Sequence, residues 1–280
     1  MINSVAAELL LLRKRVSTWI LLGIWTALAT FFSYVLPYVE YLNGDVSGGP
    51  AQVPLDELLP ARLVGTLSAG FPFFGGVFAL MLGVLALGSE YGWGTLRALL
   101  VQRPGRLRIF GAKVLALGTV LIPFVLAVYL TGAVSSYVIA RLEGAAIDWP
   151  SASILIRGLG AGWLILAVWA ALGVLLGVLS RGTALAIGVG ILYALIVEGL
   201  ISAFADAVSV LEPLVELFLR ANAYSLVEGL GLSAAGAAGN GPGAFSGPFV
   251  GGGQALVVLA AYLGGFVLIA GAVLRRRDVT

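Results

Sequence analysis

The chain lacks two residue types altogether, since none of its 280 residues is cysteine or histidine. It therefore has no disulfide, no thiolate or imidazole ligand for a metal, and no histidine general base. A metal held by carboxylates alone is the one alternative that these absences leave open. We predict no catalytic residue, no metal site and no cofactor bound by this chain.

Charged residues are scarce as well. Only 11% of the residues are charged and 60% are hydrophobic, whereas soluble domains carry roughly 25% charged residues. The mean hydropathy is +1.05, and the 39 glycines suit membrane helices, in which small residues let backbones approach closely. The composition excludes a water-soluble domain and predicts an all-α membrane protein in which residues 1–280 form a single transmembrane domain.

Six apolar stretches, nearly free of charge, are each long enough to cross about 30 Å of hydrocarbon as a helix. They cover about 17–39, 63–88, 113–140, 155–180, 183–205 and 254–274. Lipid offers no partners for exposed backbone groups, so spanning segments are helices or closed barrels. Barrel strands alternate every second residue, and these stretches are continuous. We expect six transmembrane helices.

The positive charges divide unevenly between the two sides of such a bundle. Twelve lie on the side of both termini: Arg13, Lys14, Arg15, Arg97, Arg103, Arg106, Arg108, Lys113, Arg181, Arg275, Arg276 and Arg277. Four lie on the other side: Arg62, Arg141, Arg157 and Arg220. Because Lys and Arg accumulate in cytoplasmic loops, we predict a multi-pass protein of the cell membrane with both termini in the cytoplasm.

The segment before the first span has an amphipathic pattern. Its apolar residues recur at helical spacing, at Val5, Leu9, Leu12 and Val16, beside a cluster of Arg13, Lys14 and Arg15. This pattern predicts a helix over 3–16 that lies at the membrane interface. The alternative is a basic flank that only fixes topology.

Residues 89–108 form the longest segment between spans on the side of the termini. Thr95 is suited to cap a short helix that ends before Pro104. The apolar face of that helix consists of Leu96, Leu99 and Leu100. A cytoplasmic partner that binds such a helix would be able to move the two adjoining spans. The alternative is a solvated basic loop that only sets the orientation of the spans in the membrane.

Several short motifs resemble those of permease subunits of ABC-2-type exporters, with the small antibiotic and lantibiotic efflux permeases as the most similar branch. They are E-Y-G-W-G-T-L-R from Glu90, R-P-G-R from Arg103, G-A-K at the third span, E-L-L-L-L-R-K-R from Glu8, and the terminal R-R-R-D. Together with the six-span layout, the resemblance extends over nearly the whole chain.

The resemblance implies roles for these residues. The first helix, with Glu8, Arg13, Lys14 and Arg15, would be an interfacial elbow. The loop after the second span would carry the coupling helix that docks on the ATPase subunit. The matching positions are Glu90, Gly94, Thr95, Arg97, Arg103 and Pro104. The resemblance further implies two copies of an ABC ATPase that bind Mg-ATP, and a second membrane subunit, identical or related.

The chain has no phosphate-binding loop of its own. Such a loop needs a lysine directly after a glycine, and the only lysines, Lys14 and Lys113, follow Arg13 and Ala112. An ATPase that drives this chain would be a separate polypeptide, and we expect no contact with nucleic acid.

Two features within the spans are candidate sites. Glu198 lies inside the fifth span, and an intramembrane carboxylate is a functional candidate by default; the alternative is a pairing with Arg157 near the outer face. The fourth span carries one face of small residues, which we expect to pack closely, within the bundle or at a dimer seam. They are Gly158, Gly162, Gly173 and Gly177.

An amphipathic helix is also expected outside, between the last two spans. Its apolar face comprises Leu211, Leu214, Val215 and Phe218, and its polar face Glu212, Glu216 and Arg220. The Gly/Ala-rich segment 231–253 follows and is expected to be flexible.

The leading hypothesis is the membrane subunit of an ATP-driven exporter for a hydrophobic or amphipathic compound. A secondary carrier or channel is the alternative; it would call for internal repeats or more buried charges. An embedded enzyme is a third hypothesis, and it lacks a nucleophile paired with a base.

Overall fold

The computed structural model describes residues 2–43, 53–92, 105–205, 212–232 and 250–276. Every regular element within these ranges is a helix. Six helical segments are long and apolar enough to cross a membrane, as the sequence predicted. They are Val16–Asn43, Phe71–Ser89, Leu107–Leu142, Ala152–Ser180, Thr183–Ile201 and Gly252–Arg276.

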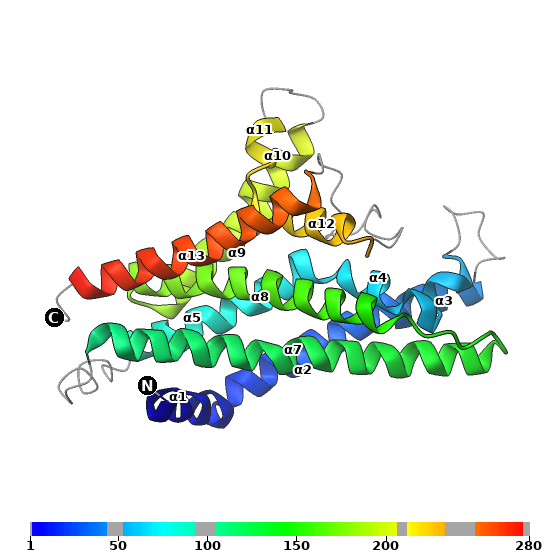
Figure 1. Cartoon of the computed structure of the whole chain (residues 1–280), viewed down its shortest axis with the longest axis horizontal. Coiled ribbons are helices and arrows are strands. Elements are labelled where there is room, and N and C mark those ends of the chain that lie inside the picture. The colour runs from blue at the N-terminus through cyan, green and yellow to red at the C-terminus, as the bar shows by residue number, and fades with distance from the viewer. Residues whose placement is uncertain (1, 44–52, 93–104, 206–211, 233–249, 277–280) are drawn as a thin grey trace.

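The helices follow one another as an elongated bundle (Figure 1). The first half comprises α1 (Ile2–Lys14), α2 (Val16–Thr30), α3 (Leu36–Asn43), α4 (Leu63–Ser68), α5 (Gly76–Gly92) and α7 (Arg106–Leu142). The second half comprises α8 (Ala152–Ser180), α9 (Thr183–Leu192), α10 (Glu198–Ala205), α11 (Glu212–Val215), α12 (Leu219–Gly229) and α13 (Gly252–Arg276). Two short 3-10 helices, η2 (Leu55–Leu58) and η3 (Pro60–Arg62), precede α4.

Three of the spans contain a π-helical turn. These turns are η1 (Phe31–Val35), η4 (Phe71–Gly75) and η5 (Tyr193–Val197). In the second span the expected helix from residue 63 is interrupted at Ala69 and Gly70, and the spanning segment begins at Phe71. Pro72 has no N–H to continue the helical ladder, which accounts for the irregular turn at this position. By contrast, α7 continues as one helix through Pro123.

The second and fourth spans form the centre of the bundle. In their most apolar parts, 78% of the residues of the α8 span and 72% of the Phe71–Ser89 span are buried, against 17% in the α13 span. Uncovered apolar side chains on α2, α9 and α13, such as Trp19, Leu185 and Leu268, are compatible with contact to lipid.

Small residues allow α5 and α8 to lie in backbone contact. A methyl group at Gly173 would collide with the carbonyl oxygen of Leu80, and one at Gly83 would collide with that of Ala170. The other glycines on the same face of α8 also meet the chain's own helices: Gly158 faces Val64 and Tyr129, Gly162 faces Phe71, and Gly177 faces Val84 and Gly88. The glycine face of α8 therefore points into the bundle.

The expected amphipathic helix over residues 211–220 is wrong in its boundaries and in one of its faces. The described part is divided into α11 and α12, with Phe218 in extended conformation between them. Arg220, expected on the polar face, is buried with 5% of its surface exposed. The reason is that α12 turns into the protein, where every residue from Leu219 to Val227 is buried against α13, α8 and η4.

Candidate functional site

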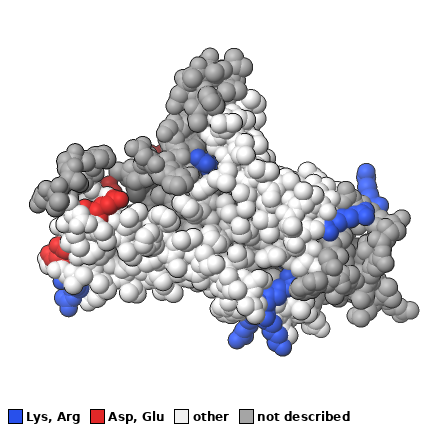
Figure 2. Space-filling view, turned by 180° about the vertical axis from the view of Figure 1, so that it is seen from behind, with Lys and Arg blue, Asp and Glu red and all other residues white. Residues whose placement is uncertain are grey.

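One end of the bundle carries most of the features that the sequence singled out. The start of α1, the end of α13 and the start of α7 lie together at the left of Figure 1. On the face shown in Figure 2, most Lys and Arg side chains lie toward this end, and the acidic side chains lie toward the other. We call it the terminal end of the bundle. The charge asymmetry derived from the sequence is thus also an asymmetry in space.

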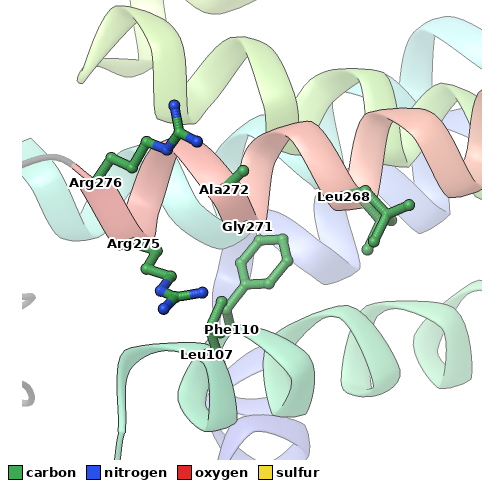
Figure 3. Close-up of a pocket in the computed structure, with 8 residues that line it drawn as sticks. Leu107, Phe110, Leu268, Gly271, Ala272, Arg275 and Arg276 are labelled. Atoms are coloured by element: carbon green, nitrogen blue, oxygen red, sulfur yellow. The ribbon is translucent and has the colours of Figure 1, made fainter.

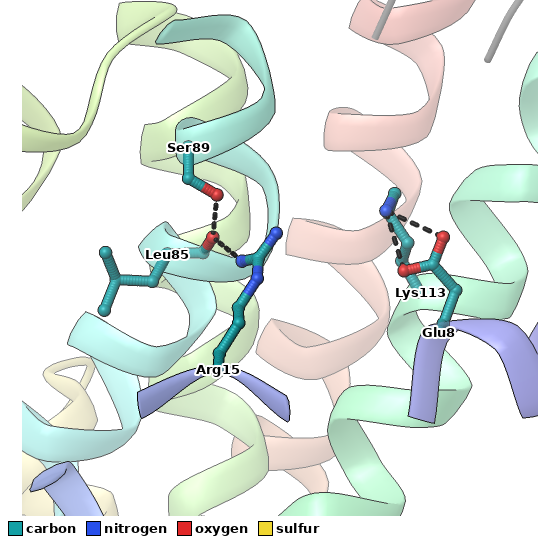
Figure 4. A network of polar contacts seen from close by, with 5 residues as sticks. All are labelled: Glu8, Arg15, Leu85, Ser89 and Lys113. Carbon is teal, nitrogen blue, oxygen red and sulfur yellow. Dashed lines mark hydrogen bonds and ion pairs between the residues drawn. The ribbon is translucent and has the colours of Figure 1, made fainter. Parts of the chain in front are cut away.

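A buried ion pair fastens α1 to α7 at this end. The ammonium group of Lys113 donates hydrogen bonds of 2.8 Å to both carboxylate oxygens of Glu8 (Figure 4). The Lys113 side chain is 4% exposed and the Glu8 side chain 12%. An ion pair with so little access to water is costly to break, because the remaining charge would be left without compensation.

A second contact joins the corner between α1 and α2 to α5. Arg15 is the only residue between the two helices, and its backbone is extended. Its guanidinium donates a 2.7 Å hydrogen bond to the carbonyl oxygen of Leu85, which also accepts the hydroxyl of Ser89 at 2.7 Å. On the outer side of the corner, the indole N–H of Trp19 donates to the carbonyl oxygen of Arg13. These bonds fix the angle between α1 and α2.

These two contacts involve both helices that flank residues 93–104 in the sequence. The segment follows α5, which is bonded to Arg15 at the corner between α1 and α2, and precedes α7, which is bonded to Glu8 of α1. Of the predicted coupling residues, Glu90 falls in the last turns of α5. The remainder, Gly94, Thr95, Leu96, Arg97, Leu99, Leu100, Arg103 and Pro104, lie outside the described residues.

The structure adds partners to the predicted elbow residues. Arg13 and Lys14 are exposed, whereas Glu8 and Arg15 face the bundle. Lys113, Leu85 and Ser89 were not singled out from the sequence as partners of α1. Only the apolar face that includes Leu12, now 5% exposed, indicated that α1 packs against something.

A second polar cluster surrounds Glu198, far from the terminal end. The carboxylate is fully buried and follows directly after the π-helical turn η5. One oxygen accepts the backbone N–H of Leu219 at 2.8 Å and the other that of Arg220 at 3.1 Å. The hydroxyl of Tyr193 interacts with the same carboxylate. Glu198 thereby satisfies the free N–H groups at the start of α12, where a negative charge is stabilising.

Arg220 lies beside this carboxylate and not in water. Its guanidinium carbon is 5.2 Å from the centroid of the Phe73 ring, a cation–π geometry. Arg157, the partner considered for Glu198, is exposed. Among the described interactions none joins Arg157 to Glu198, and the carboxylate is bonded to α12 in its place.

The described acidic residues do not form a metal-binding cluster. In the parts of the chain that the structure describes, no three Asp or Glu side chains gather closely enough to share a metal ion. Comparison with models of known protein families gives no match, and comparison with curated proteins gives none.

Proposed function

We propose that this chain is the membrane-spanning subunit of an ABC exporter of the ABC-2 type. In this proposal it forms the route for cargo and couples to a separate ATPase subunit. The observation that carries the proposal is the motif-bearing segment 90–104, which resembles the coupling segment of such permeases. In the sequence it is flanked by α5, which is bonded to Arg15 at the end of α1, and by α7, which is bonded to Glu8 of α1. The six apolar helices support the membrane location.

The contacts suggest how a movement of segment 90–104 would be transmitted to the helices that form the cargo route. Closure of an ATPase pair would act first on the end of α5 and the start of α7. Because α5 and α8 lie in backbone contact at Gly83 and Gly173, they would move as one unit. Helix α1, held to α7 through Lys113, would follow α7, and the corner between α1 and α2, held to α5 through Arg15, would follow α5.

The proposal includes the other components of such an exporter. Two ATPase copies bind Mg-ATP, and a second membrane subunit, identical or related, completes the route. Both termini and segment 90–104 lie in the cytoplasm of a cell with this protein in its plasma membrane. Cargo of hydrophobic or amphipathic character is proposed because the bundle interior is almost entirely apolar.

Co-purification with an ATPase tests this proposal. The full chain is co-expressed with a candidate P-loop ATPase from the same genome, and the complex is isolated through a tag on the chain. Leu99→Asp places a charge on the proposed docking face and is expected to abolish capture of the ATPase. Glu90→Ala is expected to preserve insertion and to weaken stimulation of ATP hydrolysis by cargo, because loss of one member of a desolvated charged contact costs about 2–5 kcal/mol.

A matched control is Leu142→Asp, which adds the same charge to an exposed leucine at the opposite end of α7. It should leave capture of the ATPase unchanged. Normal capture and normal ATP hydrolysis with Leu99→Asp would refute docking through this segment.

A secondary carrier remains the second candidate because of one observation, the buried carboxylate of Glu198. Proteoliposomes that contain only this chain would distinguish the two functions. A carrier would accumulate cargo under a proton gradient without ATP, and Glu198→Gln would abolish this accumulation. The exporter subunit alone is expected to move no cargo under the same gradient.

A further inference from the structure

A long cleft lies between α7 and α13 and opens at the terminal end of the bundle. Its outer part has a volume of about 720 Å³ and is walled by Leu107, Phe110 and Leu268. Gly271 lies on its floor, where a larger side chain would press against the Phe110 ring. Figure 3 shows the side chain of Arg275 reaching from α13 toward α7, with Arg276 leaving the other side of the same turn. The mouth of the cleft is therefore cationic and its walls are apolar.

The two arginines at the mouth are available to an anion. Both are exposed and line the outer part of the cleft. Neither forms an ion pair with any residue of the described ranges, in contrast to Lys113 two turns into α7. The guanidinium of Arg275, which points toward α7, presents forked donors that match a phosphate, and Arg276 adds a second positive charge at the mouth of the cleft.

Further along α7 and α13, toward the middle of the spans, the lining of the cleft is mainly apolar. An inner part of about 640 Å³ adjoins the outer part, since Val267 and Leu268 line both. Its floor is formed by small side chains of α8, including Ala167 and Ala171. The polar groups that border it are already paired within the protein: the indole N–H of Trp163 donates to the carbonyl oxygen of Gly118, and the hydroxyl of Thr119 donates to that of Leu115. An occupant of the inner part has no polar group left to satisfy.

The dimensions of the cleft match those of one membrane leaflet. Along α7 its lining extends from Leu107 to Ile122, which corresponds to roughly 22 Å at 1.5 Å per residue. Half of the hydrocarbon core of a bilayer is about 15 Å. The remaining length is that expected for the headgroup region, and Arg275 and Arg276 line the outer part of the cleft.

We propose that this cleft binds one phospholipid with an anionic headgroup, drawn from the leaflet at the terminal end of the bundle. The phosphate is held by Arg275, Arg276 contributes a second positive charge at the mouth, and an acyl chain lies along the inner part between α7, α8 and α13. Basic sites between helices are known to favour acidic headgroups over neutral ones. The bound lipid bridges α13 to α7, and this site does not depend on ATP-driven transport.

Native mass spectrometry of the full chain, purified in detergent and stripped of lipid, tests the proposal. The chain is titrated with dioleoyl phosphatidylglycerol and, separately, with dioleoyl phosphatidylcholine. We expect one phosphatidylglycerol molecule per chain to bind in preference to phosphatidylcholine. Each cation near an anionic headgroup contributes roughly a fivefold factor, so Arg275→Gln with Arg276→Gln should weaken phosphatidylglycerol binding roughly 25-fold. Replacing both arginines by lysine should restore most of it.

The matched charge control removes Arg141 and Arg157, two exposed arginines outside the cleft, and is expected to change binding less than twofold. A matched steric pair is available on α13. Gly264 lines the inner part and Gly265 does not, and a Cβ at either position meets nothing within 4 Å. Gly264→Phe should fill the acyl cleft and abolish tight binding, whereas Gly265→Phe should not.

Several outcomes would overturn the proposal. Equal binding of the two lipids would show that the cleft does not recognise an anionic headgroup. Displacement of the lipid by inorganic phosphate at millimolar concentration would indicate an anion site that holds no acyl chain. Unchanged lipid binding in Gly264→Phe, together with conversion of a dimer to a monomer, would assign the cleft to a second copy of the chain.

Discussion

The ammonium nitrogen of Lys113 in α7 lies 2.8 Å from both carboxylate oxygens of Glu8 in α1, although 105 positions separate the two residues. A helix of 13 residues such as α1 is only marginally stable by itself in water. Its place at the end of the bundle therefore depends on contacts of this kind and on the burial of Leu12. The pair links α1, which precedes the first span, to α7, which forms the third span.

We first predict that neutralising one member of this pair destabilises the protein more than neutralising both. Glu8→Gln or Lys113→Met alone leaves a buried charge and should cost about 3–5 kcal/mol. The double variant should recover part of this loss, which a double-mutant cycle measures as a coupling free energy. The readouts are thermal unfolding in detergent and trypsin cleavage within α1. Lys14→Gln, which removes an exposed charge from the same helix, serves as the control, and strictly additive losses would contradict a direct pairing.

The second prediction concerns the carboxylate that caps α12. Glu198→Ala removes the acceptors for the backbone N–H groups of Leu219 and Arg220, and we expect faster hydrogen exchange at those amides. Glu198→Gln retains one acceptor oxygen and should have an intermediate effect. Glu228→Ala alters an exposed residue near the other end of α12 and should leave the exchange unchanged. Equal exchange in all three variants would mean that α12 is held by apolar burial alone.

The third prediction separates two glycines of α8. Gly173→Ala drives a methyl group into the backbone of Leu80 and should destabilise the bundle by about 1–3 kcal/mol, since backbone has little freedom to yield. Gly160→Ala meets nothing within 4 Å and should be neutral or stabilising by up to about 1 kcal/mol through helix propensity. The thermal unfolding of the two variants is compared. Destabilisation of Gly173→Ala alone would support a close contact between α5 and α8, whereas equal destabilisation of both variants would mean that α8 tolerates no substitution of its glycines.

The fourth prediction is the orientation in the membrane. A reporter that is active only in the cytoplasm should work when fused at Thr280 and should fail when inserted at Asn240. The reason is that positively charged residues are concentrated at the end of the bundle where α13 finishes, and such residues are retained on the cytoplasmic side. Activity at Asn240 would require a different number of crossings between α12 and α13.

The number and rough position of the spans could be predicted from the sequence because lipid imposes a simple rule. A segment with no water to bond must be helical, long and apolar, and six stretches satisfy these conditions without reference to one another. The difference at the second span, which begins at Phe71, arises because Pro72 and the turn at Ala69 and Gly70 change the backbone without changing hydrophobicity.

Only part of the candidate site could be predicted from the sequence. Periodicity shows that Val5, Leu9 and Leu12 share a face, but it does not show which helix that face meets. The bond from Glu8 to Lys113 and that from Arg15 to Leu85 depend on how distant segments pack. For residues 93–104 the prediction of a docking helix stays a prediction, since they lie outside the described residues.

Sequence alone thus determined the composition, the six apolar helices and the imbalance of charge between the two ends, all of which are local or additive properties. Tertiary structure decided the partner of Glu198, which accepts hydrogen bonds from residues 21 and 22 positions further on. It also decided that Arg220 is buried over Phe73 and that four glycines of α8 face neighbouring helices of the same chain; they are Gly158, Gly162, Gly173 and Gly177. The physical reason is that a buried polar group must find its partner wherever the chain's folding places one, and no pattern along the chain records that distance.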